Sequence, residues 1–508
     1  MTDKPFTPSF FIRDLWPVLL VSLGLWAVLP GLYAGNLHTD TLEAAYWGRD
    51  LAWGYSKHPP LVSFLINAVL RPGTAPILTL LLLGQGLAFV SAWYAYDLVG
   101  TIAGRANAIL AACLMMVTSV ATFYSLQLNH NSVLVPFCAA TLAHGYHYLD
   151  KRRWRDAVGL GLAVGLGALT KYEIIFAVMP LLVLCLVMPR FRNVYLSPKS
   201  WLSVLIAVGL FAPHVYWLSS HGWSSLSRAV GSAPMDGVGA ALFSLWGLVI
   251  GFLAIASLPL ILIATTQQRS GLFRSSASPV PDTPMRDTQS LGRVFLVVPL
   301  IGVVLASLVT DQFIKALWLL PLTPSTMIGL TLIAAAQPSG DPALKRKTYR
   351  RSTVSLSVVM SVLFHLYMVI GDSIDMPLES YLADTRPVSD AAQQLWSEHS
   401  TGPLTCIVSD ESKLSISPVL WIASRPQILP LSVEDWLTKD RQARCASTGG
   451  IAVKFVLDQS LPVTKKFPRA CVADARHVHV ASVFGFGKTG WDAELIYIPP
   501  DAQPDCPP

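Results

Sequence analysis

The segment Asp40–Leu61 reads DTLEAAYWGRDLAWGYSKHPPL and comes shortly after the first long apolar run of the chain, residues 15–34. Its ionisable side chains are Asp40, Glu43, Arg49, Asp50, Lys57 and His58. Because charged groups next to a bilayer cost free energy, those that persist there usually serve a function. The segment therefore predicts a membrane protein with a functional loop just outside its first membrane-spanning helix.

The composition of the chain is that of a polytopic membrane protein. Hydrophobic residues make up 53% of the 508 residues and charged residues only 13%, and the mean hydropathy is +0.50. Apolar runs long enough to cross a bilayer as helices lie at 15–34, 76–99, 106–124, 131–149, 157–170, 174–189, 200–218, 239–264, 294–310, 316–336 and 353–371. We therefore expect a transmembrane domain over residues 1–371 with about eleven helices.

Basic residues are distributed unevenly between alternate loops. No small-residue cleavage site follows the first run, so we interpret it as a retained helix with a cytoplasmic N-terminus. The segments on that side then hold 19 Lys and Arg residues, and the outer loops between helices hold six. Since basic residues accumulate on the cytoplasmic side, this distribution supports the orientation. The net charge of +6 thus reflects membrane orientation and does not indicate nucleic-acid binding.

Residues 372–508 are more polar than the rest and predict a small α/β domain. Short β-rich runs such as CIVSD at Cys406 and IAVKFVLD at Ile451 alternate with turn residues. An odd number of spans places this domain outside the cytoplasm, where disulfides form. Four cysteines lie in it, namely Cys406, Cys445, Cys471 and Cys506. They allow three pairings, among which the sequence does not choose.

Polar residues recur wherever the chain returns to the outer membrane face. They include Asn129 and His130 after the third run, Lys171 and Tyr172 after the fifth, His221 and Arg228 after the seventh, and Lys315 before the tenth. With the first outer loop, residues 35–75, they predict a polar site at the outer leaflet. An enzyme would meet a lipid-borne, charged substrate at such a place.

Each of these clusters also has a purely structural explanation. Asp40 and Glu43 have the spacing of a helix-capping box, which would satisfy backbone N–H groups. Lys57–Pro60 can be a solvated turn, and Lys171 can extend to the interface only to hydrate its charge. The structural explanation is favoured for each cluster alone, and the recurrence from loop to loop favours a common site.

Several strings of sequence carry a family resemblance. They are DxxEAxxWGRxLxWGYxKHPPL in the first outer loop, YSxxxNHNSxLxP at Tyr124–Pro136, GLGALTKYEIIF at Gly165–Phe176, PHVYWL at Pro213–Leu218 and KALWLLP at Lys315–Pro321. Together they resemble the bacterial glycosyltransferase family 39, membrane enzymes of the GT-C fold. That group is related to protein O-mannosyltransferases and to the transferase that adds aminoarabinose to lipid A. The resemblance covers most of residues 10–371.

The resemblance implies a donor sugar carried on a polyprenyl phosphate, which is undecaprenyl phosphate in a bacterial inner membrane. It implies transfer on the periplasmic face with inversion at the anomeric carbon. In that family a carboxylate of the first outer loop is central to activity, and Asp40 matches it.

The chain departs from the family pattern at two places. Many members have adjacent Asp-Glu where this chain has Asp40-Thr41, with its second carboxylate at Glu43, so which carboxylate is primary stays open. Many members also have Lys-x-His-Trp where this chain reads KALW from Lys315 to Trp318, which removes one hydrogen-bond donor.

The chemistry of sugar transfer assigns roles to these residues. Departure of a polyprenyl phosphate builds negative charge on phosphate oxygens, which fixed cations stabilise. The candidate cations are Lys57, Lys171, Arg228 and Lys315, and Arg49 is a further, lower-ranked candidate. The predicted substrate-binding set also includes His58, Asn129, His130, Tyr172 and His221. A carboxylate either deprotonates an acceptor hydroxyl or orients it. Asp40 is the first choice for this role and Glu43 the second.

The sequence thus predicts an inverting glycosyltransferase of the bacterial inner membrane, with lipid A or another envelope glycolipid as its acceptor. A protein O-glycosyltransferase with the same class of donor is an alternative. A non-enzymatic lipid or sugar transporter is another, although charges at one face and the lack of repeats disfavour it. No metal-ligand spacing occurs among the histidines, so no metal or cofactor is required, and a divalent ion stays open.

Overall fold

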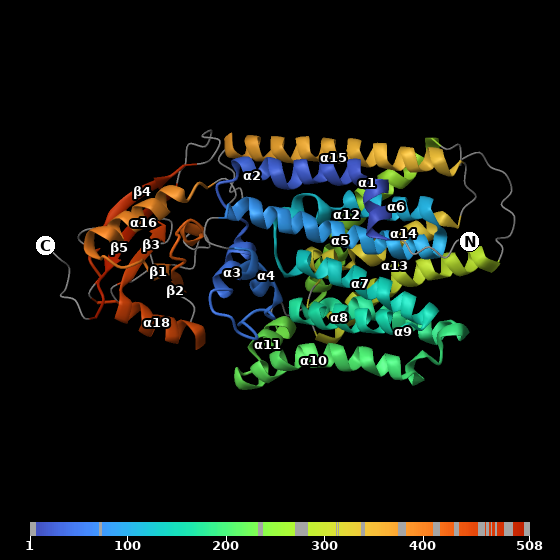
Figure 1. Cartoon of the computed structure of the whole chain (residues 1–508), viewed down its shortest axis with the longest axis horizontal. Coiled ribbons are helices and arrows are strands. Elements are labelled where there is room, and N and C mark those ends of the chain that lie inside the picture. The colour runs from blue at the N-terminus through green and yellow to red at the C-terminus, as the bar shows by residue number, and fades with distance from the viewer. Residues whose placement is uncertain are drawn as a thin grey trace. The chain divides into compact units, whose positions relative to one another are not determined.

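The structure is a computed structural model of the whole chain (Figure 1). It describes residues 7–70, 74–231, 237–269, 283–310, 312, 314–336, 341–373, 383–409, 417–430, 436–455, 463, 467–468, 470–472, 475–481 and 491–501. All structural statements below concern these residues.

Each predicted apolar run folds as a helix. The helices are α1 (Pro8–Leu23) continued by η1 (Gly24–Val28) and α2 (Leu29–Tyr33), α5 (Pro76–Ala103), α6 (Arg105–Met116), α7 (His130–Lys151), α8 (Trp154–Thr170), α9 (Ile175–Val187), α10 (Pro198–Ser220), α12 (Gly237–Arg269), α13 (Thr283–Thr310), η7 (Ala316–Leu322) with α14 (Thr323–Ala335), and α15 (Pro342–Ser373). Seven of these stretches are long and apolar enough to cross a membrane. The predicted multi-pass helical fold is confirmed. The third run, however, leaves the α-helix after Met116 and continues as short 3-10 turns.

Three shorter helices lie in the loops between the long ones. The first outer loop forms α3 (Thr39–Trp47) and α4 (Leu61–Val69), and α11 (Ser224–Gly231) follows α10. These helices carry or adjoin several of the residues predicted for the site.

The chain divides into two compact units. Unit 1 comprises residues 1–28, 52–62 and 82–361, and unit 2 comprises 29–51, 63–81 and 362–508. The first outer loop is therefore split: its first half, with α3, belongs to unit 2, and residues 52–62 belong to unit 1.

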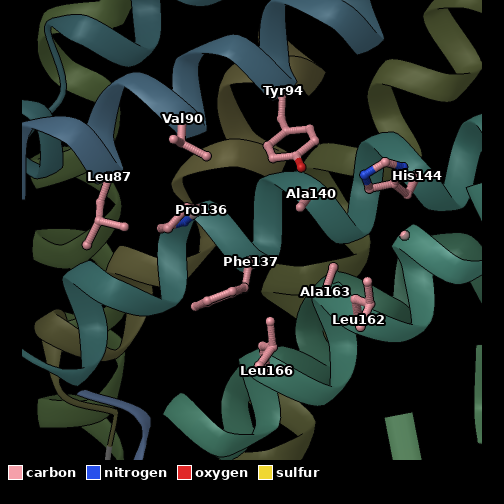
Figure 2. Close-up of a pocket in the computed structure, with 11 residues that line it drawn as sticks. Leu87, Val90, Tyr94, Pro136, Phe137, Ala140, His144, Leu162, Ala163 and Leu166 are labelled. Atoms are coloured by element: carbon pink, nitrogen blue, oxygen red, sulfur yellow. The ribbon is translucent and has the colours of Figure 1, made fainter. Parts of the chain in front are cut away.

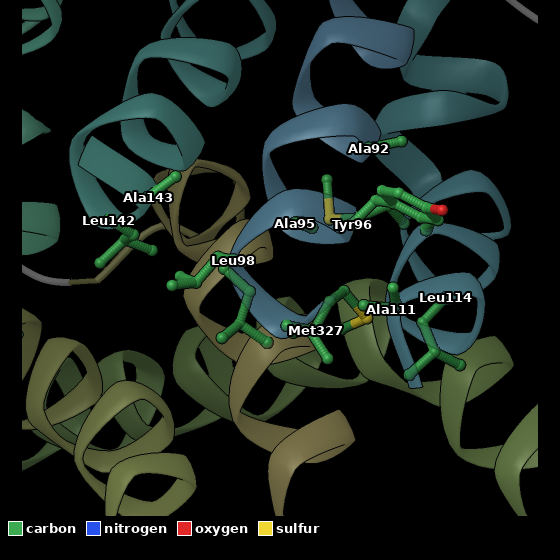
Figure 3. Packing of buried hydrophobic residues seen from close by; sticks show 14 of the residues in the cluster. Ala92, Ala95, Tyr96, Leu98, Ala111, Leu114, Leu142, Ala143 and Met327 are labelled. Carbon is green, nitrogen blue, oxygen red and sulfur yellow. The ribbon is translucent and has the colours of Figure 1, made fainter. Parts of the chain in front are cut away.

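The interior of unit 1 is apolar, with a few paired polar groups. Figure 3 shows part of its packing, with Ala92, Ala95, Tyr96 and Leu98 of α5, Ala111 and Leu114 of α6, Leu142 and Ala143 of α7, and Met327 of α14. The hydroxyl of Tyr96 donates to Asp14 Oδ2 at 2.7 Å, and Arg105 Nε donates to the same oxygen at 2.8 Å. A buried carboxylate in such surroundings is tolerated because it is paired.

Unit 2 contains a five-stranded mixed sheet in the order β2-β1-β3-β5-β4. The strands are β1 (Cys406–Ser409), β2 (Gln427–Pro430), β3 (Gly450–Phe455), β4 (Arg476–Val480) and β5 (Trp491–Ile498). Strand β1 pairs in parallel with β2 and β3, whereas β5 is antiparallel to β3 and β4. With helices α16 (Arg386–His399) and α18 (Trp436–Thr448), this confirms the predicted C-terminal α/β domain.

The described cysteines of this domain form disulfides. Cys406 of β1 and Cys445 of α18 form a disulfide, and Cys471 is also disulfide-bonded. Cys506 lies outside the described residues. The bond between Cys406 and Cys445 ties helix α18 to strand β1 of the sheet.

Candidate active site

The two predicted catalytic carboxylates lie on α3, within unit 2. The ring Nδ1 of His38 caps this helix by accepting the backbone N–H of Asp40 at 3.2 Å. Asp40 is therefore the second residue of the helix, and the capping-box interpretation of Asp40 and Glu43 is wrong. The residues of α3 from Ala44 to Trp47 are buried, whereas Asp40 and Glu43 are only partly buried. Three residues apart, the two carboxylates share one face of the helix.

Arg49 lies just beyond the end of α3, in an arginine-rich part of unit 2. Burial, together with the charges of Arg425 and Arg441, lowers the pKa of Arg49 to about 10. Arg49 is therefore still protonated at neutral pH and keeps the positive charge that its predicted role requires.

In unit 1 a set of polar side chains surrounds the start of α7. The imidazole rings of His58 and His130 stack with centroids 3.9 Å apart. Lys171 Nζ donates to Asn131 Oδ1 at 2.8 Å and lies 2.6 Å from Glu173 Oε1. We call these five residues the histidine–lysine cluster. The structure thus brings together predicted residues from the first loop, α7 and the turn before α9.

Lys171 is held inside the protein. Its side chain is only 12% exposed. A lysine that merely hydrates its ammonium group at the interface would be far more exposed.

The predicted cation Lys57 is half-buried and precedes His58 in the chain. Both residues lie in a turn that is closed by a hydrogen bond from Tyr55 N to His58 O at 3.0 Å.

Asn129 has a structural role in this arrangement. Its Oδ1 accepts the backbone N–H groups of Asn131 at 3.0 Å and Ser132 at 3.1 Å, and Ser132 Oγ accepts from Asn129 N at 3.0 Å. This reciprocal capping box fixes the N-terminus of α7. It thereby also fixes the backbone of His130 and Asn131.

A second set of hydrogen bonds, the Tyr172 network, joins four segments of unit 1: the first loop, the turn before α9, α10 and α11. Its members are Trp53, Tyr172, His214 and Ser225. The Tyr172 hydroxyl lies 2.9 Å from His214 Nε2 and 2.8 Å from Ser225 Oγ. His214 Nδ1 lies 2.6 Å from the carbonyl oxygen of Trp53. Since a carbonyl only accepts, Nδ1 carries the proton, and Nε2 accepts from Tyr172.

The loop beside this network packs against α10 at close range. A Cβ on Gly54 would lie 2.2 Å from the ring of Trp217, so only glycine fits there. Trp217 also stacks on the predicted residue His221, with ring centroids 4.3 Å apart.

Lys315 and Arg228 also belong to unit 1. Lys315 is exposed, precedes η7, and places its Nζ 5.8 Å from the centroid of the Trp318 ring. Ile314 next to it donates its N–H to Ser244 Oγ of α12 at 3.0 Å, which anchors this loop. Arg228 belongs to α11, and its side chain is outside the described part of the chain.

Several members of these networks are not among the predicted site residues. Asn131 and Glu173 adjoin predicted residues, so the strings NHN and KYE contained a signal for them. The carbonyl of Trp53 and the hydroxyl of Ser225 carried no signal, because only folding brings them to Tyr172 and His214. In the described ranges, no group of three or more His, Cys, Asp or Glu side chains is arranged to hold a metal ion.

A cavity of about 230 Å³ lies between α5, α7 and α8 (Figure 2). Its lining is mostly apolar, with Tyr94 and His144 as its polar members. None of the residues predicted for the site lines this cavity. It is therefore separate from the histidine–lysine cluster and the Tyr172 network.

One segment of the chain matches a known protein family. Residues 57–217 match the model of a family described as dolichyl-phosphate-mannose-protein mannosyltransferase. This segment contains the whole histidine–lysine cluster. The family resemblance expected from the sequence is confirmed.

Curated relatives include enzymes of Rhizobium johnstonii. The lipopolysaccharide core galacturonosyltransferase RgtA is 27% identical over 253 residues, which cover 48% of this chain and 50% of RgtA. The lipid A galacturonosyltransferase RgtD is 26% identical over 208 residues, 40% of this chain and 43% of RgtD. The chain thus spans about half the length of the curated relatives it matches.

Solved structures of ArnT from Cupriavidus metallidurans have a similar fold over nearly the whole chain. The apo structure gives a TM-score of 0.56 at 13% identity and covers 95% of this chain and 97% of ArnT. The structure bound to undecaprenyl phosphate gives 0.57 at 12% identity and covers 97% and 98%. Over residues 57–217 this chain is similar to the family described as dolichyl-phosphate-mannose-protein mannosyltransferase, and its fold is similar to that of ArnT.

Proposed function

We propose that this protein is a membrane glycosyltransferase that moves a sugar from a polyprenyl phosphate to lipid A or to the core of lipopolysaccharide. The observation that carries the proposal is the largely buried cation Lys171, held by Asn131 and Glu173 inside the segment that matches the family model. A fixed ammonium group of this kind suits an anionic phosphate that leaves during the reaction.

The donor class follows from the relatives. ArnT has been solved with undecaprenyl phosphate, and the family description names a lipid-phosphate sugar. We therefore assign a polyprenyl-phosphate sugar as donor, with Lys57, Lys171 and Lys315 as the cations for its phosphate. Since RgtA and RgtD are galacturonosyltransferases, galacturonate is the first sugar to test.

The reaction breaks the bond between the anomeric carbon and the phosphate oxygen. An acceptor oxygen attacks the opposite face of the anomeric carbon, which inverts its configuration, and the polyprenyl phosphate leaves with the bonding electron pair. If the acceptor is a hydroxyl, its proton passes to the carboxylate of Asp40 or Glu43. If the acceptor is a phosphate, no proton has to be removed, and the carboxylate only orients the reactants.

The proposed location is the bacterial inner membrane, with a cytoplasmic N-terminus and a periplasmic C-terminal domain. Single cysteines introduced at exposed positions test this orientation. Ser397→Cys in α16 should react with a membrane-impermeant maleimide on intact spheroplasts, whereas Leu344→Cys in α15 should react only after permeabilisation. The opposite pattern would reverse the orientation.

Mass spectrometry of lipid A and core oligosaccharide tests the function. Cells that produce the protein should carry a sugar that is missing from deletion cells and from cells with the Asp40→Asn variant. Purified protein should likewise consume an undecaprenyl-phosphate sugar. If purified wild-type protein transfers no sugar from any such donor, the proposal fails.

A protein acceptor is the second candidate, because the family description names a protein mannosyltransferase. Glycopeptide analysis of the same strains separates the two candidates. Loss of glycopeptides with unchanged lipid A and core would move the acceptor from glycolipid to protein.

A further inference from the structure

A fully buried arginine of the C-terminal α/β domain contacts the helix that carries the candidate carboxylates. Arg441 of α18 is 0% exposed. Its Nε donates to Asp50 Oδ2 at 2.6 Å, and its Nη1 donates to Ile428 O at 2.8 Å. Its Nη2 lies 3.4 Å from Tyr46 O, and the guanidinium carbon lies 4.3 Å from the centroid of the Tyr46 ring. All of these residues belong to unit 2.

These contacts lie at the C-terminal end of α3. The carbonyl of Tyr46 also accepts the backbone N–H of Arg49 at 3.2 Å, and Asp50 N donates to Trp47 O at 3.2 Å. Carbonyl groups in the last turn of a helix carry partial negative charge and lack helical partners. Arg441 supplies both a donor and a positive charge there, so it acts as a C-terminal cap that comes from helix α18.

The other side of the arginine is anchored rigidly. Ile428 belongs to β2, which pairs with β1. Helix α18 is joined to β1 by the disulfide between Cys445 and Cys406, and Cys445 lies one helical turn from Arg441. The sheet therefore fixes the position of the guanidinium group that contacts α3.

A second arginine of the same domain reaches the other helix of the first outer loop. Arg425 Nη2 donates to Asn67 Oδ1 of α4 at 2.8 Å. Two arginines of the C-terminal domain thus hold α3 and α4.

A buried arginine is expensive unless its donors are used, and removal of one partner leaves the other charge uncompensated. A hydrophobic contact would join the two segments at lower cost. The planar guanidinium adds directional hydrogen bonds to a carboxylate and to two carbonyls at once, which fixes orientation as well as distance.

We propose that Arg441 is a positioning residue of the transfer reaction, which fixes α3 and through it the carboxylates of Asp40 and Glu43. This inference rests on the proposed function. It makes the C-terminal domain the scaffold of the carboxylate-bearing helix.

The kinetic test compares Arg441→Gln with Arg444→Gln on the same helix. Arg444 is half-exposed, bonds Gln427 Oε1 at 2.9 Å and reaches Asp50 Oδ1 only at 3.6 Å. Arg441→Gln should lower kcat about 10- to 100-fold, the scale of a small misplacement of reacting groups. The donor KM should change less than about 2-fold, because the candidate lysines are untouched. Arg444→Gln should keep near wild-type kcat.

Asp50→Asn provides a second variant that keeps the shape of the acceptor and removes its charge. It should lower kcat like Arg441→Gln. The kcat of the double variant should equal that of the less active single variant, since both changes remove the same contact. Additive losses, or a rise in donor KM with unchanged kcat, would overturn the positioning role.

Hydrogen–deuterium exchange supplies a readout that does not depend on catalysis. In the full-length protein in detergent, Arg441→Gln and Asp50→Asn should speed exchange of the amides of residues 42–50, whereas Arg444→Gln should not. Unchanged exchange of these amides would refute the role of Arg441 in fixing α3. If the variants exchange faster but the wild-type protein transfers no sugar, the proposed function is refuted. The contact between Arg441 and α3 then has only a structural role.

Discussion

His214 Nδ1 in α10 lies 2.6 Å from the carbonyl oxygen of Trp53 in the first outer loop. The Tyr172 hydroxyl then lies 2.9 Å from the opposite nitrogen of the same ring. A single imidazole therefore joins the first loop, α10 and the turn before α9. Residues 52–62 belong to unit 1, whereas residues 29–51 belong to unit 2.

Asp40→Asn should abolish most sugar transfer. The change keeps the size of the side chain and removes its charge, and loss of a general base typically costs about 10²- to 10⁴-fold in rate. Because the Asp40 side chain is 42% exposed, the free energy of unfolding should change by less than about 0.5 kcal/mol. Transfer assays and thermal unfolding check both statements. Glu43→Gln is the matched control, and a full loss in that variant with an active Asp40→Asn would make Glu43 the primary carboxylate.

Lys171→Ala should weaken use of the donor. The variant loses a buried ammonium group and leaves Glu173 without its cation, so kcat/KM for the lipid-phosphate sugar should fall by about 10²-fold or more. Lys199→Ala is a suitable control. Its Nζ donates to a backbone carbonyl, Arg152 O, at 2.7 Å and lies 5.2 Å from the centroid of the Trp154 ring. Equal losses in the two variants would mean that Lys171 acts through general stability and not through the donor.

Gly54→Ala should displace the first loop from α10. The new Cβ would meet the Trp217 ring at 2.2 Å, and relief of that overlap requires movement of the Trp53 carbonyl or of the ring. Overpacking of this kind costs about 1–3 kcal/mol of unfolding free energy. Gly209→Ala in the same α10 has no atom within 4 Å and should be neutral. A wild-type melting temperature for Gly54→Ala would contradict the close packing.

Tyr172→Phe should destabilise unit 1 by about 1–3 kcal/mol, because it leaves the His214 Nε2 acceptor and the Ser225 hydroxyl without the phenol. Thermal unfolding in detergent measures the effect. Tyr216→Phe on α10 is the control, since Tyr216 is 79% exposed and exposed changes usually stay within about 0.5 kcal/mol. Equal melting temperatures for the two variants would show that the hydroxyl of Tyr172 contributes nothing to stability.

The site could be predicted only where its signal was local. Lys171 and His58 stood out because charge beside an apolar run is visible in the sequence itself. Other features depend on the direction of side chains, which the sequence does not specify. They are the capping role of His38, the cap formed by Asn129 and the anchoring of Lys171 by Glu173.

The sequence by itself determined the membrane-spanning helices and the existence of the α/β domain. Apolar runs must form helices in a bilayer because every backbone group needs a partner there, and this constraint is local. Only the tertiary structure decided that the first outer loop is shared between two units, and that Arg441 reaches Asp50 across 391 positions of the chain. A contact over such a separation is selected by the packing of whole elements, for which no periodicity or motif near either residue provides a signal.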